Sequence, residues 1–198
     1  MKLSRNTRRR LGLYGTALVV AVVALSVPVI VKRRAPHVPV RMFDVPAALA
    51  HPATRMLIDY VRIDTANPPG ITREAIRLLA NAFACEGIPY EIVGPDPERP
   101  ILVARLLSPA RGGGLMLLHH VDVAPVGDVS QWRVPPFAGQ MGVGEDLYYL
   151  FGRGTLDLKG LGVASFFAVA DLRRAGITPR RDVVYVAEQG PVTFDLFD

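Results

Sequence analysis

The segment Leu11–Val31 constrains the amino-terminal part of the chain most strongly, because its 21 residues contain no charged side chain. At about 1.5 Å of rise per residue, a helix of this length spans roughly the 30 Å hydrocarbon core of a bilayer. Basic residues flank the segment on both sides: Lys2, Arg5, Arg8, Arg9 and Arg10 before it, and Lys32, Arg33 and Arg34 after it. We therefore expect a single transmembrane anchor over residues 11–31.

An uncleaved anchor explains this segment better than a cleaved signal peptide does. A signal peptide has a shorter apolar region followed by a small-x-small cleavage site, and "VPVIVKRRAP" offers no good site. Five basic residues before the segment and three directly after it predict a cytoplasmic amino terminus and a domain on the periplasmic or extracytoplasmic side. The expected organisation is a basic tail (1–10), the anchor (11–31), a proline-dotted linker (32–50) and a folded domain (51–198).

The charge of the chain is divided unevenly between these parts. Through Arg41 there are nine Lys or Arg and no acidic residue, whereas from Met42 onward 14 basic residues stand against 18 acidic ones. The sequence pI of about 9.7 therefore comes from the segment around the anchor. A nucleic-acid partner is not indicated, because the folded domain is itself slightly acidic.

The order of elements after the linker predicts an α/β fold. Apolar periodicity indicates helices from His51 to the "NPPG" motif at 67–70, over about 72–86, and over about 159–175. Short β-type runs occupy 90–93, 101–107, 115–118 and 182–187, and a loop rich in Pro and Gly is expected from Pro125 to Gly154. We expect a central mixed sheet with helices on both faces. The single cysteine, Cys85, is expected to be a buried structural thiol.

Two histidines and an aspartate follow the third β-type run, in the sequence "LLHHVDVAP". Successive strand residues point to opposite faces, so only one of His119 and His120 can point toward a given site. In α/β sheets the reactive groups lie beyond the carboxyl ends of the strands, which is where these residues fall. A polar end of a strand is the simpler explanation of an isolated His-x-Asp, and Asp157, just before a predicted helix, has the simpler explanation of an N-cap.

The combination of motifs is more specific than either residue alone. "HVDVAP" at 120–125, "WRVPPF" at 132–137 and "GRGTLDLKG" at 152–160 occur in that order. Together with "NPPG", this stretch resembles the zinc metallopeptidase and amidohydrolase family that includes acetylornithine deacetylase, succinyl-diaminopimelate desuccinylase, aminoacylase and carboxypeptidase G. The resemblance runs from about His51 to Ala187. It implies a catalytic α/β domain that hydrolyses amide bonds in small peptides or N-acyl amino acids with two zinc ions.

The resemblance also implies roles for individual residues. His120 would bind one zinc ion, and Asp122 would hold the other imidazole nitrogen and fix its tautomer. Asp157 would be the carboxylate that bridges both metal ions. Packing or turn-positioning roles are expected for the remaining residues of the motifs, His119, Trp132, Phe137, Arg153 and Lys159.

The sequence departs from the family after the last predicted strand. In the family that strand leads into two adjacent acids, a general base and a metal ligand, and here the corresponding positions are Pro191 and Val192. Glu188, a single carboxylate beside Gln189, is the candidate for the acidic position, and we expect the chain to be truncated before the acidic pair. A catalytic zinc ion normally takes three protein ligands, so a catalytically inactive fragment or a non-enzymatic binding module is the alternative. Substrate identity and oligomeric state are not specified by these residues.

Overall fold

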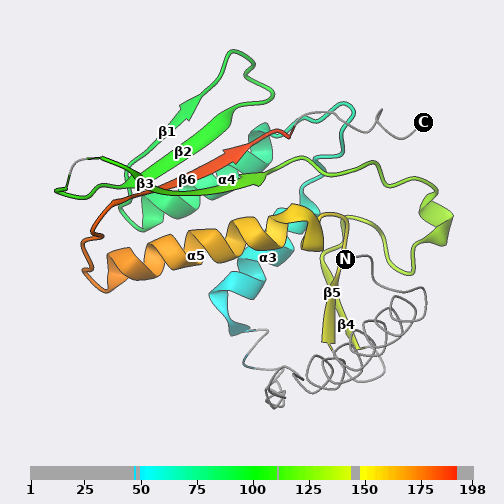
Figure 1. The fold of residues 1–198 in the computed structure, drawn as a ribbon. Coiled ribbons are helices and arrows are strands. Elements are labelled where there is room, and N and C mark those ends of the chain that lie inside the picture. The colour runs from blue at the N-terminus through cyan, green and yellow to red at the C-terminus, as the bar shows by residue number, and fades with distance from the viewer. Residues whose placement is uncertain (1–46, 48–49, 111, 144–147, 191–198) are drawn as a thin grey trace, which may run out of the picture. The chain divides into compact units, whose positions relative to one another are not determined.

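A four-stranded mixed sheet forms the centre of the computed structural model, which describes residues 47, 50–110, 112–143 and 148–190 (Figure 1). The strands are β1 (Tyr90–Val93), β2 (Ile101–Leu106), β3 (Gly114–His120) and β6 (Asp182–Glu188), in the spatial order β1-β2-β6-β3. β2 runs antiparallel to both β1 and β6, whereas β3 and β6 run parallel. The mixed sheet is therefore confirmed, and the carboxyl ends of β3 and β6 lie next to each other.

Two helices, α4 (Arg73–Cys85) and α5 (Gly160–Arg174), cover one face of this sheet, and α3 (Pro52–Arg62) lies farther out on the same side (Figure 1). Every second residue of β2 and β6 is buried beneath them, namely Leu102, Ala104, Leu106, Val183, Tyr185 and Ala187. On the opposite face no helix lies over the sheet in the part of the chain that is described. The expectation of helices on both faces is corrected accordingly, because period-2 burial in strands shows that one face is covered without showing what covers the other.

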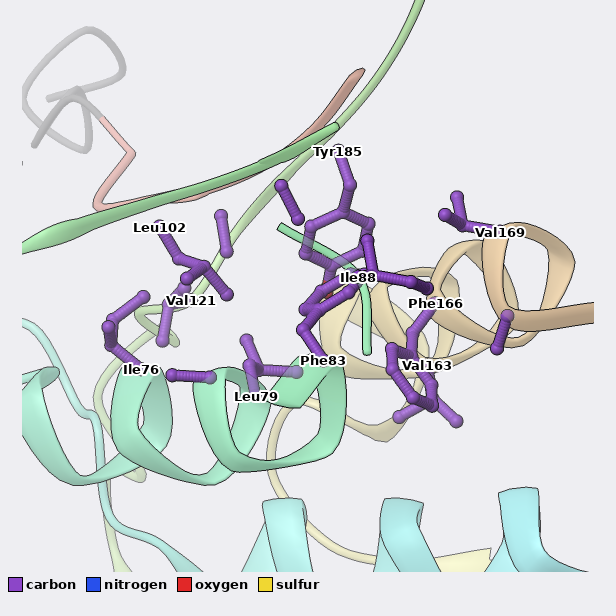
Figure 2. Close-up of a cluster of buried hydrophobic side chains, with 14 of the residues drawn as sticks. Ile76, Leu79, Phe83, Ile88, Leu102, Val121, Val163, Phe166, Val169 and Tyr185 are labelled. Atoms are coloured by element: carbon purple, nitrogen blue, oxygen red, sulfur yellow. The ribbon is translucent and has the colours of Figure 1, made fainter. Parts of the chain in front are cut away.

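The core between helices and sheet is built around aromatic side chains (Figure 2). The Phe83 ring meets the Phe166 ring at a centroid distance of 4.9 Å and the Tyr185 ring at 4.8 Å, both edge to face. Phe83 ends the apolar stripe of α4 that the sequence predicts. Cys85 lies two residues beyond it and is exposed. A step of two residues turns a helix by about 200°, so this thiol falls on the solvent side and the expectation that it is buried was wrong.

The open face of the sheet carries apolar side chains of its own. Met116 is 62% exposed and Leu118 48% exposed. Both lie on β3, which ends the strand order of the sheet. β3 continues two residues beyond the predicted run and ends at His120, so both histidines belong to the strand.

The predicted loop from Pro125 to Gly154 contains a second, smaller sheet. The strands β4 (Gln140–Val143) and β5 (Tyr148–Phe151) pair antiparallel, and a short 3₁₀ helix, η1, covers Val129–Gln131. A Cβ atom at Gly142 would lie 2.6 Å from the Phe151 ring, so the glycine lets this ring lie across the neighbouring strand. Each strand has only four residues, which is too short for a clear alternation in the sequence.

The predicted anchor, residues 11–31, and the basic tail before it lie outside the described residues. Within the described ranges, none of the helices combines the length and the apolar composition that crossing a bilayer requires.

Candidate metal centre

His120 ends β3 with its imidazole held by a backbone carbonyl. Nδ1 lies 2.8 Å from the carbonyl oxygen of Asp122. Since a carbonyl oxygen can only accept a hydrogen bond, Nδ1 carries the proton that is donated to it. In the neutral ring Nε2 is then an unprotonated acceptor. The side chain is 30% exposed, so Nε2 is accessible to a ligand from one side of the fold.

Asp157 brings a carboxylate directly opposite this nitrogen. Its Oδ1 lies 3.2 Å from Nε2 of His120, although the two residues are 37 positions apart in the chain. An unprotonated ring nitrogen and a carboxylate oxygen are both acceptors, so they repel at this distance unless a proton or a cation lies between them. Two ligand atoms of a tetrahedral zinc ion, each about 2.0–2.1 Å from the metal, lie roughly 3.3–3.4 Å apart. The two side chains therefore fit as a pair of zinc ligands.

A sharply bent turn before α5 presents the Asp157 carboxylate. The turn, η2 (Thr155–Lys159), begins after Gly154, whose φ of 85° is in the left-handed region. Asp157 itself is extended, with φ −126° and ψ 94°, and its side chain is 76% exposed. In the described part of the chain the carboxylate makes no capping hydrogen bond to the backbone of α5. The turn thus directs Asp157 toward His120, and the N-cap explanation does not apply.

Lys159 anchors this turn to the end of α3. Its side chain is fully buried, and Nζ donates to the carbonyl oxygens of Tyr60 at 3.0 Å and Ile63 at 2.7 Å. Carbonyls at the carboxyl end of a helix lack intrahelical donors and form the negative end of the helix dipole, which suits an ammonium group. Burial lowers the pKa of Lys159 to about 8, and the Asp64 carboxylate opposes this shift. The positioning role expected for Lys159 is confirmed.

Asp122 is buried at the centre of a hydrogen-bond network. Its Oδ1 accepts from the backbone N–H of Gly190 at 2.7 Å, and its Oδ2 accepts from Nδ2 of Asn67 at 2.8 Å. Oδ1 lies 3.5 Å from Nδ1 of His120. The shorter contact to this imidazole is therefore made by the backbone carbonyl of Asp122, and the carboxylate is a neighbour at longer range.

His119 points to the opposite face of β3, among the helices. Its Nε2 hydrogen-bonds the Tyr60 hydroxyl at 3.1 Å, and its ring packs 5.4 Å from that of Tyr185. Burial lowers the pKa of His119 to about 4, with the nearby His120 adding to the effect, so the ring is neutral at pH 7. Burial also raises the pKa of Tyr60, and the Asp122 carboxylate contributes to that shift. The packing role expected for His119 is confirmed.

Glu188 ends β6 beside His120 in the parallel register. Its backbone carbonyl accepts from the Val121 N–H at 2.7 Å. Among the described residues its carboxylate takes part in no hydrogen bond or ion pair, and Pro191 and Val192 lie outside them. No group of three or more His, Cys, Asp or Glu side chains that could hold a metal ion is present in the described ranges. The described part of the site thus consists of two converging candidate ligands, His120 and Asp157.

The chain is similar to known proteins over the segment that carries His120 and Asp157. Residues 116–190 match the family model described as Peptidase family M20/M25/M40. A probable succinyl-diaminopimelate desuccinylase of Staphylococcus epidermidis is 32% identical over 139 residues, which is 70% of this chain and 32% of the relative. Over these residues the chain is similar to members of the M20 peptidase family.

Other M20 relatives extend the comparison. The succinyl-diaminopimelate desuccinylase of Methylocella silvestris is 33% identical over 127 residues, covering 62% of this chain and 30% of the relative. An M20 family metallo-carboxypeptidase from Sulfolobus solfataricus has a TM-score of 0.58 at 23% identity, over 70% of this chain and 30% of that one. Human carnosine dipeptidase 1 has a TM-score of 0.54 at 21% identity, over 73% and 33%. These two structures show the shared fold, and the chain spans about a third of the length of the curated relatives it matches.

The remaining motif residues pack the loop beside the candidate metal site. Trp132 donates from Nε1 to the Val126 carbonyl at 2.8 Å, and the Arg153 guanidinium lies 5.0 Å from the centre of the Trp132 ring. Arg153 also donates to the Pro125 carbonyl at 2.9 Å. Phe137 is partly buried in the same loop. These contacts agree with the loop-packing and turn-positioning roles expected from the sequence.

Sequence reasoning missed the part that Asn67 plays. The residue belongs to "NPPG", which marked the end of a helix and contributed to the family resemblance but was given no role in the site, and the residue is 3% exposed. Its burial in the fold reveals this part, because a buried amide requires hydrogen-bond partners.

Proposed function

We propose that this chain contributes the metal-binding edge of an M20 hydrolase that cleaves an amide bond in a small peptide or an N-acyl amino acid. The observation that carries the proposal is the convergence of two acceptors, Nε2 of His120 and Oδ1 of Asp157, at 3.2 Å. Such a pair is stable when a cation lies between its members. The desuccinylase and carboxypeptidase names of the relatives support an amide or peptide substrate.

Zinc is the proposed metal, with His120 and Asp157 as ligands. Zinc bound there supplies Lewis acidity, which polarises the carbonyl of the scissile amide. His120 is pre-oriented for binding because its Nδ1–H is engaged by the Asp122 carbonyl. Asp157 has its second carboxylate oxygen available for another zinc ion, since only Oδ1 has a hydrogen-bond partner in the described part of the chain. Asp122 is proposed to hold the His120 ring.

The remaining ligands and the general base are proposed to lie outside the described residues. A catalytic zinc ion normally takes three protein ligands and a water molecule. Glu188, next to His120 in the register of β3 and β6, is the described carboxylate best placed for the acidic position. Its own contribution is testable by Glu188→Gln, which keeps its shape and removes its charge.

Zinc binding by the full-length chain tests the proposal. Isothermal titration should show zinc binding that His120→Ala and Asp157→Asn each weaken by at least tenfold. His51→Ala and Asp59→Asn are matched controls, because both residues are exposed and lie outside the site. A panel of N-acyl amino acids and dipeptides then identifies the substrate class. Wild-type protein that binds no zinc, or His120→Ala that binds as tightly as wild type, contradicts the proposal.

A non-enzymatic module of the same fold is the second candidate. The observation in its favour is that the described ranges bring together two candidate ligands, His120 and Asp157, without a third His, Cys, Asp or Glu that could hold a metal ion with them. Zinc binding without hydrolysis of any member of the substrate panel would support this candidate over the enzyme.

We also propose that residues 11–31 anchor the protein in a membrane, with the domain on the extracytoplasmic side. Their lack of charge and the larger number of basic residues before them support this orientation. Protease digestion of intact spheroplasts should remove the domain. Release of the protein by alkaline carbonate would contradict the anchor, and protection from the protease would contradict the orientation.

A further inference from the structure

Asn67 lies on a short segment that is fixed against the chain after β3. Its backbone N–H donates to the Val123 carbonyl at 2.9 Å, and the Val123 N–H donates to the Thr65 carbonyl at 3.0 Å. Ala66 and Val123 form a parallel bridge between the two segments. The backbone of Asn67 is thereby held beside Asp122, although the two residues are 55 positions apart.

The side chain of Asn67 has little freedom of its own. It is 3% exposed, and the turn that follows closes over it, with the Gly70 N–H donating to the Ala66 carbonyl at 2.8 Å. A Cβ atom at Gly70 would lie 2.9 Å from the Asn67 side-chain oxygen. The amide is therefore confined between the turn and Asp122, and Nδ2 is kept pointing at the carboxylate.

The Asp122 carboxylate depends on this amide. Its side chain is 7% exposed, and a buried carboxylate is stable only when donors satisfy its oxygens. Gly190 supplies one donor to Oδ1, and Asn67 supplies one to Oδ2 at 2.8 Å. A further donor close to this carboxylate is Nδ1 of His120, which lies 3.5 Å from Oδ1.

We infer that Asn67 is a positioning residue that acts on the metal ligand His120 through Asp122. By holding the carboxylate of Asp122, it leaves Nδ1–H of His120 to the Asp122 carbonyl and keeps Nε2 directed at Asp157. The inference rests on the proposed metal site for its consequence, whereas the hydrogen bonds that carry it join protein atoms alone. Loss of the Asn67 donor lets the carboxylate compete for Nδ1–H and turns the imidazole away from Asp157.

Asn67→Asp tests this inference, because it preserves the shape of the side chain and replaces the donor by an acceptor. Thr65→Val is the matched control: it removes a hydrogen bond of 2.8 Å between the same two segments, from Thr65 to the Val121 carbonyl, without touching Asp122. Both variants are made in the full-length chain. Asn67→Ala replaces Asn67→Asp if the latter does not fold.

Two measurements on these variants separate positioning from simple stabilisation. The first is the two-bond ¹⁵N–¹H spectrum of the histidine rings without metal, at one neutral pH. Asn67→Asp should shift the His120 ring nitrogens, and Thr65→Val should leave them in place. The second is zinc affinity, which Asn67→Asp should lower by about tenfold or more and Thr65→Val should leave within about twofold.

The outcomes distinguish the inference from the proposed function. Unchanged His120 ring signals in Asn67→Asp overturn the inference, whatever the zinc affinity. Equal changes in Asn67→Asp and Thr65→Val also overturn it, because the effect would then come from loosening of the two segments. A wild-type chain that binds no zinc contradicts the proposed metal site, while the ring spectra still test the role of Asn67.

Discussion

Replacing Lys159 with methionine tests how the turn that carries Asp157 is anchored. Lys159→Met keeps the length of the side chain and removes the ammonium group that donates to the Tyr60 and Ile63 carbonyls. The Tyr60 carbonyl keeps a second donor, the Ile63 N–H at 3.3 Å, so Ile63 is the carbonyl that loses its partner. A buried polar group left without a partner costs about 1–3 kcal/mol, and a lost hydrogen bond from a charged donor about 1.5–3 kcal/mol.

The variant no longer has to bury a charged ammonium group, which offsets part of these contributions. The expected net loss in the free energy of unfolding is about 2–4 kcal/mol. Urea unfolding followed by circular dichroism measures the loss. Arg55→Met is the control, since Arg55 is an exposed basic residue on α3, and it should change the stability by less than about 0.5 kcal/mol. A loss in Lys159→Met no larger than in Arg55→Met would refute this account of the turn.

Three further substitutions test the packing around the site. Gly162→Ala places a Cβ atom 2.3 Å from Nε2 of His119, so α5 must move away from β3. Thermal unfolding should show a loss of about 1–3 kcal/mol in the free energy of unfolding, and an unchanged midpoint would contradict the close approach. Gly154→Ala places a Cβ atom on a residue with a φ of 85°, where side chains are strained, and 2.5 Å from the Val123 side chain. It should lower both the free energy of unfolding and the zinc affinity, and an unchanged zinc affinity would show that the turn tolerates the change. Phe83→Ala empties the centre of the aromatic cluster and should cost about 3–5 kcal/mol in urea unfolding, with zinc affinity of the folded protein unchanged.

The helices and strands of the domain were largely predictable, because their signals are local. The apolar stripe of α4 and the β-type run of β6 repeat with the periods of a helix and a strand, and the structure places both within two residues of the prediction. The exceptions are Cys85, the β4-β5 hairpin and the end of α3, which lies at Arg62 and not at the "NPPG" motif. The thiol lies at a helix end just past the apolar stripe, and four-residue strands are too short to show a period.

Local sequence patterns could not show which faces of the sheet are covered by helices. β6 follows β3 by more than sixty residues in the chain, yet it lies between β2 and β3, parallel to one and antiparallel to the other. Strand alternation marks which residues share a face, but it is the same whether helices cover one face or two. Only the packing of α3, α4 and α5 together decides this.

Part of the candidate metal site could likewise be predicted from the sequence, and part could not. Residue types and motif order in the sequence were sufficient to select His120, Asp122 and Asp157, because metal ligands must be particular side chains. The sequence could not show that the Asp122 backbone, more than its carboxylate, holds the imidazole. Nor could it show that Lys159 bonds to carbonyls 96 and 99 positions away, because every residue has a carbonyl and only the fold decides which ones meet. The sequence therefore determined which groups have the required chemistry, and the tertiary structure decided how backbone atoms from distant segments orient them.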